Sequence, residues 1–487
     1  GDSTTLTWQA EELHRLDLYP GGQSVGALTD KGGAGQITVS PATSIEYLLV
    51  GTNRNGASVR AVSVIVDDHL LPVRINEFMA DNHLSIEDGR GEPSDWIELY
   101  NPNNQPCDLA GYGLSDDPAT PMKWVFPSVS IPAHGCLLVF ASGRSAPWDE
   151  AGGLHANFQL DAEGESVVLT APDGASVVDG ISAFPPQRED LAYGRTLDGR
   201  LTFLDPTPGG PNLAASYEGW LQPPAFSHAR GFHTNAFALT ITNPNQGADL
   251  FYSIDGREPA LRYGGPLPVS TSLSVRATVR RPGYKSPRTV THSYVLIDAV
   301  MASASMNQNM VRDARYTDRI RRGLTDLPTL MIAVPQIPDD YIEREASVEL
   351  LWPDQKPHAQ ANCGFFRFGG AWTTFNKKNY RLKFRGEYGA TKLRAPLFRG
   401  MDRGFLARES FDEIDLVGGS HDMIDRGFYM AGRFTEDTML DMGSLNPHGR
   451  FVNVYLNGKY WGQYHARERL TDSFLADYLG GKREDYV

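Results

Sequence analysis

Short alternating sequences between turn residues are the feature that most restricts what this chain can fold into. Near the N-terminus, LTWQAEELHRLDLYP and GQITVSPATSIEYLLVGTNRNGASVRAVSVIVDD alternate apolar and polar residues around Pro-Gly-Gly and Asn-Arg-Asn-Gly. A period of two indicates strands with one buried face, and such turn residues join antiparallel strands. The 49 glycines and 32 prolines recur at intervals along the chain. They extend the prediction of short strands joined by turns beyond this first segment.

The length and composition indicate several globular domains. A chain of 487 residues is too long for one hydrophobic core, so about three or four domains are expected. Hydrophobic residues make up 41% and charged residues 21%, as in ordinary globular proteins. The formal net charge of −14 argues against a general nucleic-acid binder, which needs a positive surface. That charge favours an exported, water-soluble protein.

Targeting signals and cysteines limit the predictions of membrane insertion, export and disulfide bonding. No run of 18 apolar residues occurs, so no membrane-spanning helix is predicted. The polar start GDSTTLTW lacks the apolar segment of a signal peptide, which favours a mature or trimmed protein. Cys107, Cys136 and Cys363 are too few to form a disulfide framework. Cys107 and Cys136 either pair in an oxidising compartment or remain buried thiols.

Three β-rich parts carry family resemblances. Residues 1–70 resemble bacterial immunoglobulin-like modules, although only seven residues precede Trp8 and the module is expected to be N-terminally incomplete. Residues 73–212 contain INEFMA, DWIELYN, DLAGYGLSD and GESVVL, and they resemble the lamin-tail domain, which implies an immunoglobulin-like β-sandwich. Residues 222–297 contain YSIDGREP, similar to the small β-sandwich at the C-termini of chitobiases and hexosaminidases. That resemblance implies an accessory module.

The last part of the sequence predicts helices as well as strands. Residues 298–325 are expected to be helical or a linker, and residues 326–487 have an α+β pattern. Strands are predicted at VELLWP, YRLKF, DEIDLV and FVNVYLNGKYWGQYHA, and helices at MIDRGFYMAGRFTEDTML and RLTDSFLADYL. GGSHDMIDRGFYM and VNVYLNGKYWGQYHARERLTDSF resemble CotH-type atypical protein kinases. The predicted fold is therefore a series of tandem immunoglobulin-like β-sandwiches followed by an α+β atypical-kinase-like domain.

A basic stretch marks the candidate nucleotide site. Between residues 363 and 408 there are eleven Lys or Arg and two acids, a local reversal in an acidic chain. Lysine and forked arginine side chains suit phosphate oxygens. The stretch FGGAWTTFNKKNYRLKF matches the kinase-like pattern of glycine, small polar residues and a lysine before a strand. The resemblance thus implies Lys378 or Lys377 as the phosphate lysine, with Arg385 as a further phosphate ligand. The alternative is a solvated basic face, or one that docks an acidic neighbour.

Two further residues complete this prediction. The resemblance places Glu468, after Gly462 and Tyr464, at the start of a helix where it pairs with Lys378. Its alternative role is a carboxylate that interacts with the helix dipole. In the segment SHDMIDR, Arg426 is expected to hold a phosphate or an ion pair. A hydrolase triad around Ser420 and His421 is rejected, because adjacent residues rarely share triad geometry.

An acidic turn in the second part is a candidate calcium site. The predicted ligands are Glu77, Asp88 and Asp95, with Asp81 and Glu98 nearby. Calcium takes six to eight oxygens from such loops. The alternative is a turn whose carboxylates are satisfied by backbone amides.

The resemblance also implies ATP and Mg²⁺ as cofactors and a protein substrate. The acidic metal motif of the family is expected after the helix near Glu468, and none follows before Val487, so this chain is expected to be inactive alone. Its parent is expected to be a secreted or cell-surface bacterial Ser/Thr kinase of surface or coat proteins, with the sandwiches as spacers and docking surfaces. The alternative is a non-catalytic structural or adhesion protein with surface-assembly partners in a cell wall or matrix. Carbohydrate binding is suggested only by fold analogy.

Overall fold

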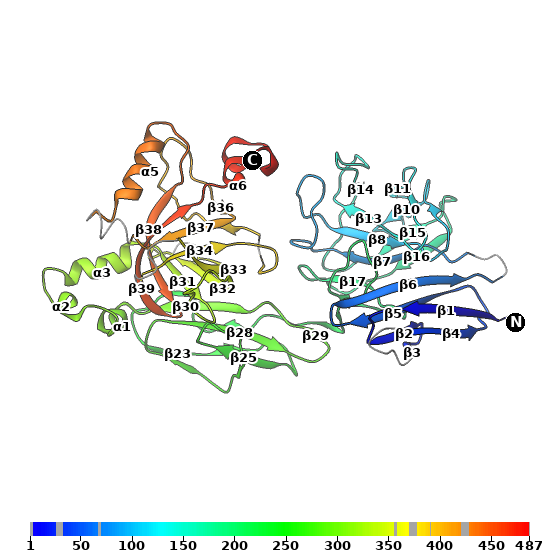
Figure 1. Ribbon diagram of the computed structural model, residues 1–487, viewed down its shortest axis with the longest axis horizontal. Coiled ribbons are helices and arrows are strands. Elements are labelled where there is room, and N and C mark those ends of the chain that lie inside the picture. Colours follow the sequence, from blue (N-terminus) through cyan, green and yellow to red (C-terminus); the bar gives the residue numbers. More distant parts are fainter. Residues whose placement is uncertain are drawn as a thin grey trace. The chain divides into compact units, whose positions relative to one another are not determined.

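The computed structural model describes residues 3–25, 33–66, 70–354, 358–369, 377–389, 391–419 and 428–486. The chain forms two compact units, Gly1–Trp220 and Leu221–Val487 (Figure 1). Both are rich in β-strands, and the described helices lie in the second unit. The protein is therefore mostly β and multidomain, as the turn-rich sequence predicts.

The first unit begins with a small antiparallel module. Its strands are β1 (Thr4–Ala10), β2 (Arg15–Tyr19), β3 (Gln23–Ser24), β4 (Gly33–Val39), β5 (Ile45–Asn53) and β6 (Gly56–Val64). One sheet has the order β3-β2-β5-β6, and β1 pairs separately with β4. Leu48 and Val50 of β5 are buried, whereas Tyr47 and Leu49 are only partly buried. This alternation confirms the predicted period of two.

The remainder of this unit is a β-sandwich. Its strands are β7 (Arg74–Met79), β8 (Trp96–Tyr100), β9 (Cys107–Asp108), β10 (Gly113–Ser115), β11 (Trp124–Val125), β12 (Ser130–Ile131), β13 (Cys136–Ala141), β14 (Leu154–Ala156), β15 (Val167–Thr170), β16 (Val177–Ile181), β17 (Ala192–Arg195), β18 (Leu201–Leu204) and β19 (Ser216–Tyr217). The short strand β20 (Gly219–Trp220) follows and belongs to neither of its two main sheets. A sheet β11-β10-β15-β16 faces a larger one, β14-β13-β8-β7-β17-β18-β19. Leu114 and Leu169 from the first sheet share one core with Phe78 and Ile97 from the second. Cys107 and Cys136 are free thiols.

The second unit starts with another small sandwich. Its strands are β21 (Ala225–Phe226), β22 (Gly231–Phe232), β23 (Phe237–Leu239), β24 (Ile241–Thr242), β25 (Asp249–Ser253), β26 (Leu261–Arg262), β27 (Leu267–Val269), β28 (Leu273–Arg280), β29 (Tyr284–Lys285) and β30 (Val290–Val295). The main sheet has the order β22-β30-β28-β25-β26. The predicted Asp255-Gly256 turn follows β25, and Gly256 has φ +78°. A Cβ there would lie 2.3 Å from the Val334 carbonyl oxygen, so this turn requires glycine against the neighbouring barrel.

The barrel is the centre of the second unit. Its elements and flanking helices are α1 (Ile297–Ala302), α2 (Gln308–Val311), α3 (Thr317–Asp326), β31 (Thr329–Ala333), β32 (Arg344–Leu351), β33 (Ala359–Phe368), β34 (Asn379–Lys383), β35 (Leu393–Arg394), β36 (Ser410–Phe411), β37 (Glu413–Val417), α5 (Ala431–Asp441), β38 (Gly449–Leu456), β39 (Lys459–Glu468), α6 (Asp472–Leu479) and the 3₁₀ turn η1 (Arg483–Asp485). Strands β31-β32-β33-β34-β37-β39-β38 close on themselves through the parallel pair β31–β38. Alternate residues such as Val348, Phe365 and Leu382 fill the interior.

The segment expected as helix or linker, 298–325, is a structured support of the barrel. Helices α1 and α3 share a hydrophobic cluster with β30, β31 and β38, which includes Val295, Val300, Leu324, Met331 and Tyr455. The small sandwich also contacts the barrel through Arg230 and the buried Glu349 of β32, whose Nη1 and Oε1 atoms lie 3.1 Å apart. The small sandwich, the helices and the barrel therefore pack against one another as one body and are not joined only by flexible linkers.

Candidate nucleotide site

The strand register places the two expected key residues at opposite ends of the barrel. Glu468 pairs with Ile414, and Ile414 pairs with Leu382. Lys378 lies four residues before Leu382, which is roughly 13 Å along a strand. The predicted Lys378–Glu468 pair therefore does not form. Glu468 also does not start a helix: it is the last residue of β39.

Lys377 lies at the rim of the barrel, just before β34. Its Nζ donates to the backbone carbonyl of Gln463 and lies 3.2 Å from the Tyr429 hydroxyl. The same Nζ lies 5.0 Å from the centre of the Tyr429 ring and 4.7 Å from that of Tyr464. Within the described part of the chain, no carboxylate comes within salt-bridge distance of it. Burial lowers the pKa of Lys377 to about 8, because the charged form loses hydration without gaining a counter-ion.

Lys378 shares this end of the barrel with a lip formed by residues 339–341. Its Nζ lies 3.8 Å from Oδ1 of Asp339. Arg367, at the end of β33, donates to the Asp339 carbonyl at 2.7 Å and lies 4.7 Å above the Tyr341 ring. The Tyr341 hydroxyl donates to the carbonyl of Gly369 at 2.8 Å. The lip therefore holds the first glycine of the predicted glycine-rich segment beside the basic residues.

Most of the basic stretch is neutralised by acids from elsewhere in the sequence. Arg381 and Asp415 are register partners with Nε and Oδ1 at 2.6 Å, and Lys383 pairs with Glu413 at 3.1 Å. Arg385, a predicted phosphate ligand, lies 2.6 Å from Glu343. Ion pairs thus neutralise most of the positive charge in this stretch of the sequence. Lys377 differs from these residues in having none among the described carboxylates.

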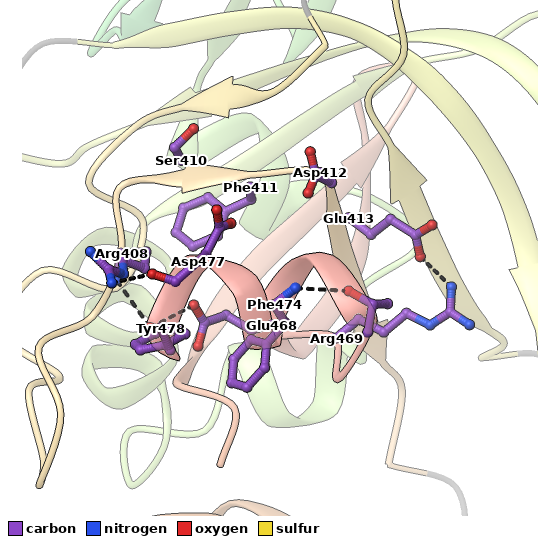
Figure 2. A pocket seen from close by; sticks show the side chains of 11 residues that line it. Arg408, Ser410, Phe411, Asp412, Glu413, Glu468, Arg469, Phe474, Asp477 and Tyr478 are labelled. Carbon is purple, nitrogen blue, oxygen red and sulfur yellow. Dashed lines mark hydrogen bonds and ion pairs between the residues drawn. The ribbon is translucent and has the colours of Figure 1, made fainter. Parts of the chain in front are cut away.

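Glu468 lies in a separate cluster at the far end of the barrel (Figure 2). Its Oε2 accepts from the His448 backbone N–H at 2.7 Å and lies 3.0 Å from Nδ1 of the same residue. Its Oε1 accepts from the Tyr478 hydroxyl of α6 at 2.8 Å. His448 is fully buried and stacks on Tyr478. The adjoining cavity of about 20 Å³ holds little more than a water molecule. These contacts, which include His448, attach α6 to the barrel.

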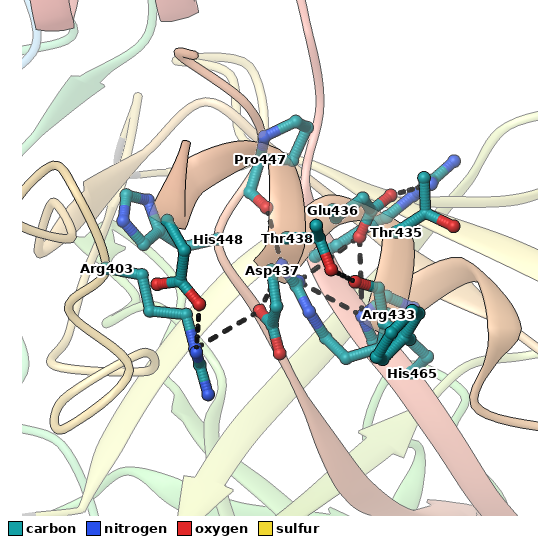
Figure 3. A network of polar contacts seen from close by, with 12 residues as sticks. Arg403, Arg433, Thr435, Glu436, Asp437, Thr438, Pro447, His448 and His465 are labelled. Carbon is teal, nitrogen blue, oxygen red and sulfur yellow. Dashed lines mark hydrogen bonds and ion pairs between the residues drawn. The ribbon is translucent and has the colours of Figure 1, made fainter. Parts of the chain in front are cut away.

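A second polar cluster anchors α5 on β39 and on the segment that leads into β38 (Figure 3). Arg433 of α5 is buried, donates to the Pro447 carbonyl at 3.1 Å and pairs with Asp437 at 2.7 Å. Its Nη1 lies 3.3 Å from Nε2 of His465 on β39. Burial, together with the neighbouring Arg433 and Arg467, lowers the pKa of His465 to about 3, so this imidazole stays neutral. No sequence pattern indicates this cluster, because its members lie on elements that meet only in the fold.

The predicted calcium ligands do not come together. Glu77 Oε1 accepts from the backbone and hydroxyl of Thr207, while Asp88 pairs with Arg144 at 2.7 Å. Asp95 accepts from the backbone N–H of Asn82, and burial raises its pKa to about 6. In the parts of the chain that are described, no three His, Cys, Asp or Glu side chains form a metal-binding group. Backbone amides donate to Asp88 and Asp95, as in the alternative interpretation, and Asp88 in addition pairs with Arg144.

The rim of the barrel fits the phosphate part of a nucleotide better than it fits a metal. Lys377 and Lys378 supply cationic donors, whereas the described carboxylate beside them is Asp339 alone. Arg426 and residues 370–376 of the glycine-rich segment lie outside the described residues. Across the described helices, none has the length and apolar character needed to cross a membrane.

Comparisons with known proteins agree with two of the sequence resemblances. Residues 71–184 match the lamin tail domain family, and residues 366–487 match the CotH kinase protein family. No curated protein matches the chain.

Solved structures give only weak similarity. An I-band fragment of titin is 11% identical with a TM-score of 0.15, and the alignment covers 61% of this chain and 93% of that one. A Salmonella alpha-2-macroglobulin mutant is 11% identical with a TM-score of 0.14, and the alignment covers 85% of this chain and 30% of that one. By its family matches, the chain is similar to lamin tail domains in its first unit and to CotH kinase proteins at its C-terminal end.

Proposed function

We propose that the barrel binds the phosphates of a nucleoside triphosphate at the Lys377 end, as the nucleotide-binding part of a protein kinase. The observation that carries this proposal is the partly buried Lys377 ammonium, which has no carboxylate partner in the described chain. A partly desolvated cation without a counter-ion is unfavourable, and a bound anion would relieve that cost.

The neighbouring groups fit a phosphate-binding role. The Gln463 carbonyl and the Tyr429 hydroxyl hold the Lys377 amine in one place, so little freedom would be lost on binding. Lys378 and Arg367 lie beside the Gly369 end of the glycine-rich segment and add positive charge at the same rim. Mg²⁺ bound with the nucleotide would supply charge neutralisation at the phosphates. This chain's own contribution is to orient the phosphates and to hold a proton on Lys377.

The wider role follows from the similarity to CotH kinase proteins over residues 366–487. On that basis the acceptor is a Ser or Thr hydroxyl of a surface or coat protein, and the protein is exported from a bacterial cell. The sandwich in the second unit packs against the barrel, so it is a fixed support of the kinase-like part. A structural or adhesion protein without nucleotide affinity is the outcome that would replace this proposal.

The test is calorimetric titration of Mg-ATP into the full chain and three lysine variants. Lys377→Ala should weaken binding by roughly tenfold or more, as loss of a charge-assisted phosphate contact implies. Lys378→Ala should weaken it less, because Asp339 already lies near that amine. Lys459→Ala is the matched control: it removes an exposed lysine at the first residue of β39, roughly 13 Å along the strand from Gln463, and should bind as the wild type does. Equal affinity in all four proteins, or no heat in any, would exclude this site.

A further inference from the structure

The helical hairpin α2–α3 presents a cluster of arginines in an otherwise acidic chain. Five arginines and two aspartates occur between residues 312 and 322, while the whole chain has a net charge of −14. Arg315 pairs with Asp313 and Arg321 with Asp298, each at 2.6 Å. Arg312 and Arg319 are exposed, and no carboxylate of the described chain pairs with either. This surface therefore retains positive charge that the fold itself does not neutralise.

An apolar groove runs beside these arginines. It has a volume of about 320 Å³ and is lined by Met306, Met310, Ile320, Leu324, Tyr460 and Gln463, among others. Met310 is 44% exposed although it belongs to this lining. The volume suits one or two apolar side chains of a bound peptide. Methionine side chains are flexible and polarizable, and they adapt to differing apolar partners.

The groove adjoins the candidate nucleotide site. Gln463 lines the groove, and its backbone carbonyl accepts from both Lys377 Nζ and the Tyr429 hydroxyl. A segment bound in the groove would therefore lie one residue away from the lysine that is proposed to hold the phosphates.

We propose that the α2–α3 hairpin and its groove form a docking surface for an acidic peptide segment of the acceptor protein. Glu or Asp side chains of the peptide pair with Arg312 and Arg319, and a Leu- or Met-sized side chain enters the groove. Opposite charge orients the encounter and the apolar side chain supplies the contact area. The assignment of the peptide to an acceptor rests on the proposed kinase function, whereas binding itself does not.

The test is fluorescence anisotropy with the full chain and a fluorescein-labelled peptide of repeated Glu-Glu-Leu. The wild type should bind this peptide, and the double variant Arg312→Ala/Arg319→Ala should bind it about tenfold or more weakly. Met310→Ser should also weaken binding. Arg262→Ala is the matched control, because it removes an exposed arginine from the small sandwich of the same unit. It should leave the affinity unchanged.

Two further sets of measurements distinguish peptide docking from the proposed nucleotide binding and from binding of other anions. The groove variants should bind Mg-ATP as the wild type does, and Lys377→Ala should still bind the peptide. Peptide binding that is unaffected by the arginine and Met310 variants would overturn the inference even if nucleotide binds. Equal binding of a Glu-Glu-Ser peptide, of phosphatidylserine vesicles or of single-stranded DNA would also overturn it, because the surface would then be a general anion site.

Discussion

Glu77 and Glu98 are register partners on β7 and β8, and both side chains are fully buried. Neutral groups hold them: Thr207 donates to Glu77, and Asn76 and Gly209 donate to Glu98. Burial, with the neighbouring Glu98, raises the pKa of Glu77 to about 7, and burial raises the pKa of Glu98. Since no described Lys, Arg or His pairs with them, the folded state favours a proton on this pair.

The sign of the resulting pH dependence follows from the raised pKa. The folded state binds the proton more tightly than the unfolded state, so the stabilisation is complete below about pH 4.5 and is lost as pH rises through about 7. Glu77→Gln keeps the acceptor for Thr207 and removes the charge. We expect it to raise the free energy of unfolding at pH 8 by roughly 2 kcal/mol and to change it little at pH 5. Hydrogen exchange of the β7 and β8 amides measures the free energy of unfolding at pH 8 and at pH 5. A Glu77→Gln variant that is less stable than the wild type at pH 8 would contradict the raised pKa of Glu77.

At the residue scale, local sequence predicted the order of neighbouring residues and strands but not which residues meet across strands. Lys377 and Lys378 directly precede β34, as the pattern of a glycine, small polar residues and a lysine before a strand predicts. The partners of Arg385 and Glu468 lie on other strands and helices. Nothing in the spacing of the sequence fixes which residues of β34, β37 and β39 stand opposite one another.

The buried side chain of Arg433 links helix α5 to the barrel through Pro447 and His465. Arg433→Ala would leave Asp437 and Glu436 without their buried partner, and breaking such a pair costs about 3 kcal/mol or more. We expect the α5 amides to exchange markedly faster while the β31 and β32 amides exchange as before. Arg403→Ala, which removes a more exposed partner of Asp437 and Asp441, is the matched control and should cost less than about 1 kcal/mol. Equal exchange of α5 in both variants would show that the cluster does not anchor the helix.

At the level of elements, hydrophobic alternation and capping residues predicted individual strands and helices, but they did not predict how the strands pair in the barrel. The strands expected at YRLKF and DEIDLV match β34 and β37, and the helix expected at RLTDSFLADYL contains α6. There the Thr471 hydroxyl accepts from the Phe474 N–H at 3.1 Å, a local cap that is readable from sequence. Closure of the barrel depends on the parallel pair β31–β38, whose residues lie more than a hundred positions apart. Such long-range pairing has no local signature.

On the scale of the whole molecule, the small sandwich and the barrel should unfold together. Glu349 is fully buried beside Arg230, and burial raises its pKa to about 7 in spite of that arginine. Arg230→Ala should therefore lower the stability of the second unit by about 3 kcal/mol and leave the first unit unchanged. Differential scanning calorimetry should show the loss in one transition only. Adding Glu349→Gln should recover much of it, and a failure to recover would argue against the buried charge as the cause.

Lys377 is partly desolvated and has no carboxylate partner among the described residues, and it is the residue proposed to bind nucleotide phosphate. The most direct measurement is an NMR titration of ¹³C-dimethylated lysines in the full chain, with Lys377→Arg to assign the resonance. We predict a pKa of about 8 without nucleotide and a clear rise on adding Mg-ATP, because a bound anion stabilises the protonated amine. Affinity for Mg-ATP should correspondingly fall as pH rises above about 8. A Lys377 resonance that titrates near the ordinary lysine value and does not respond to Mg-ATP would contradict the account.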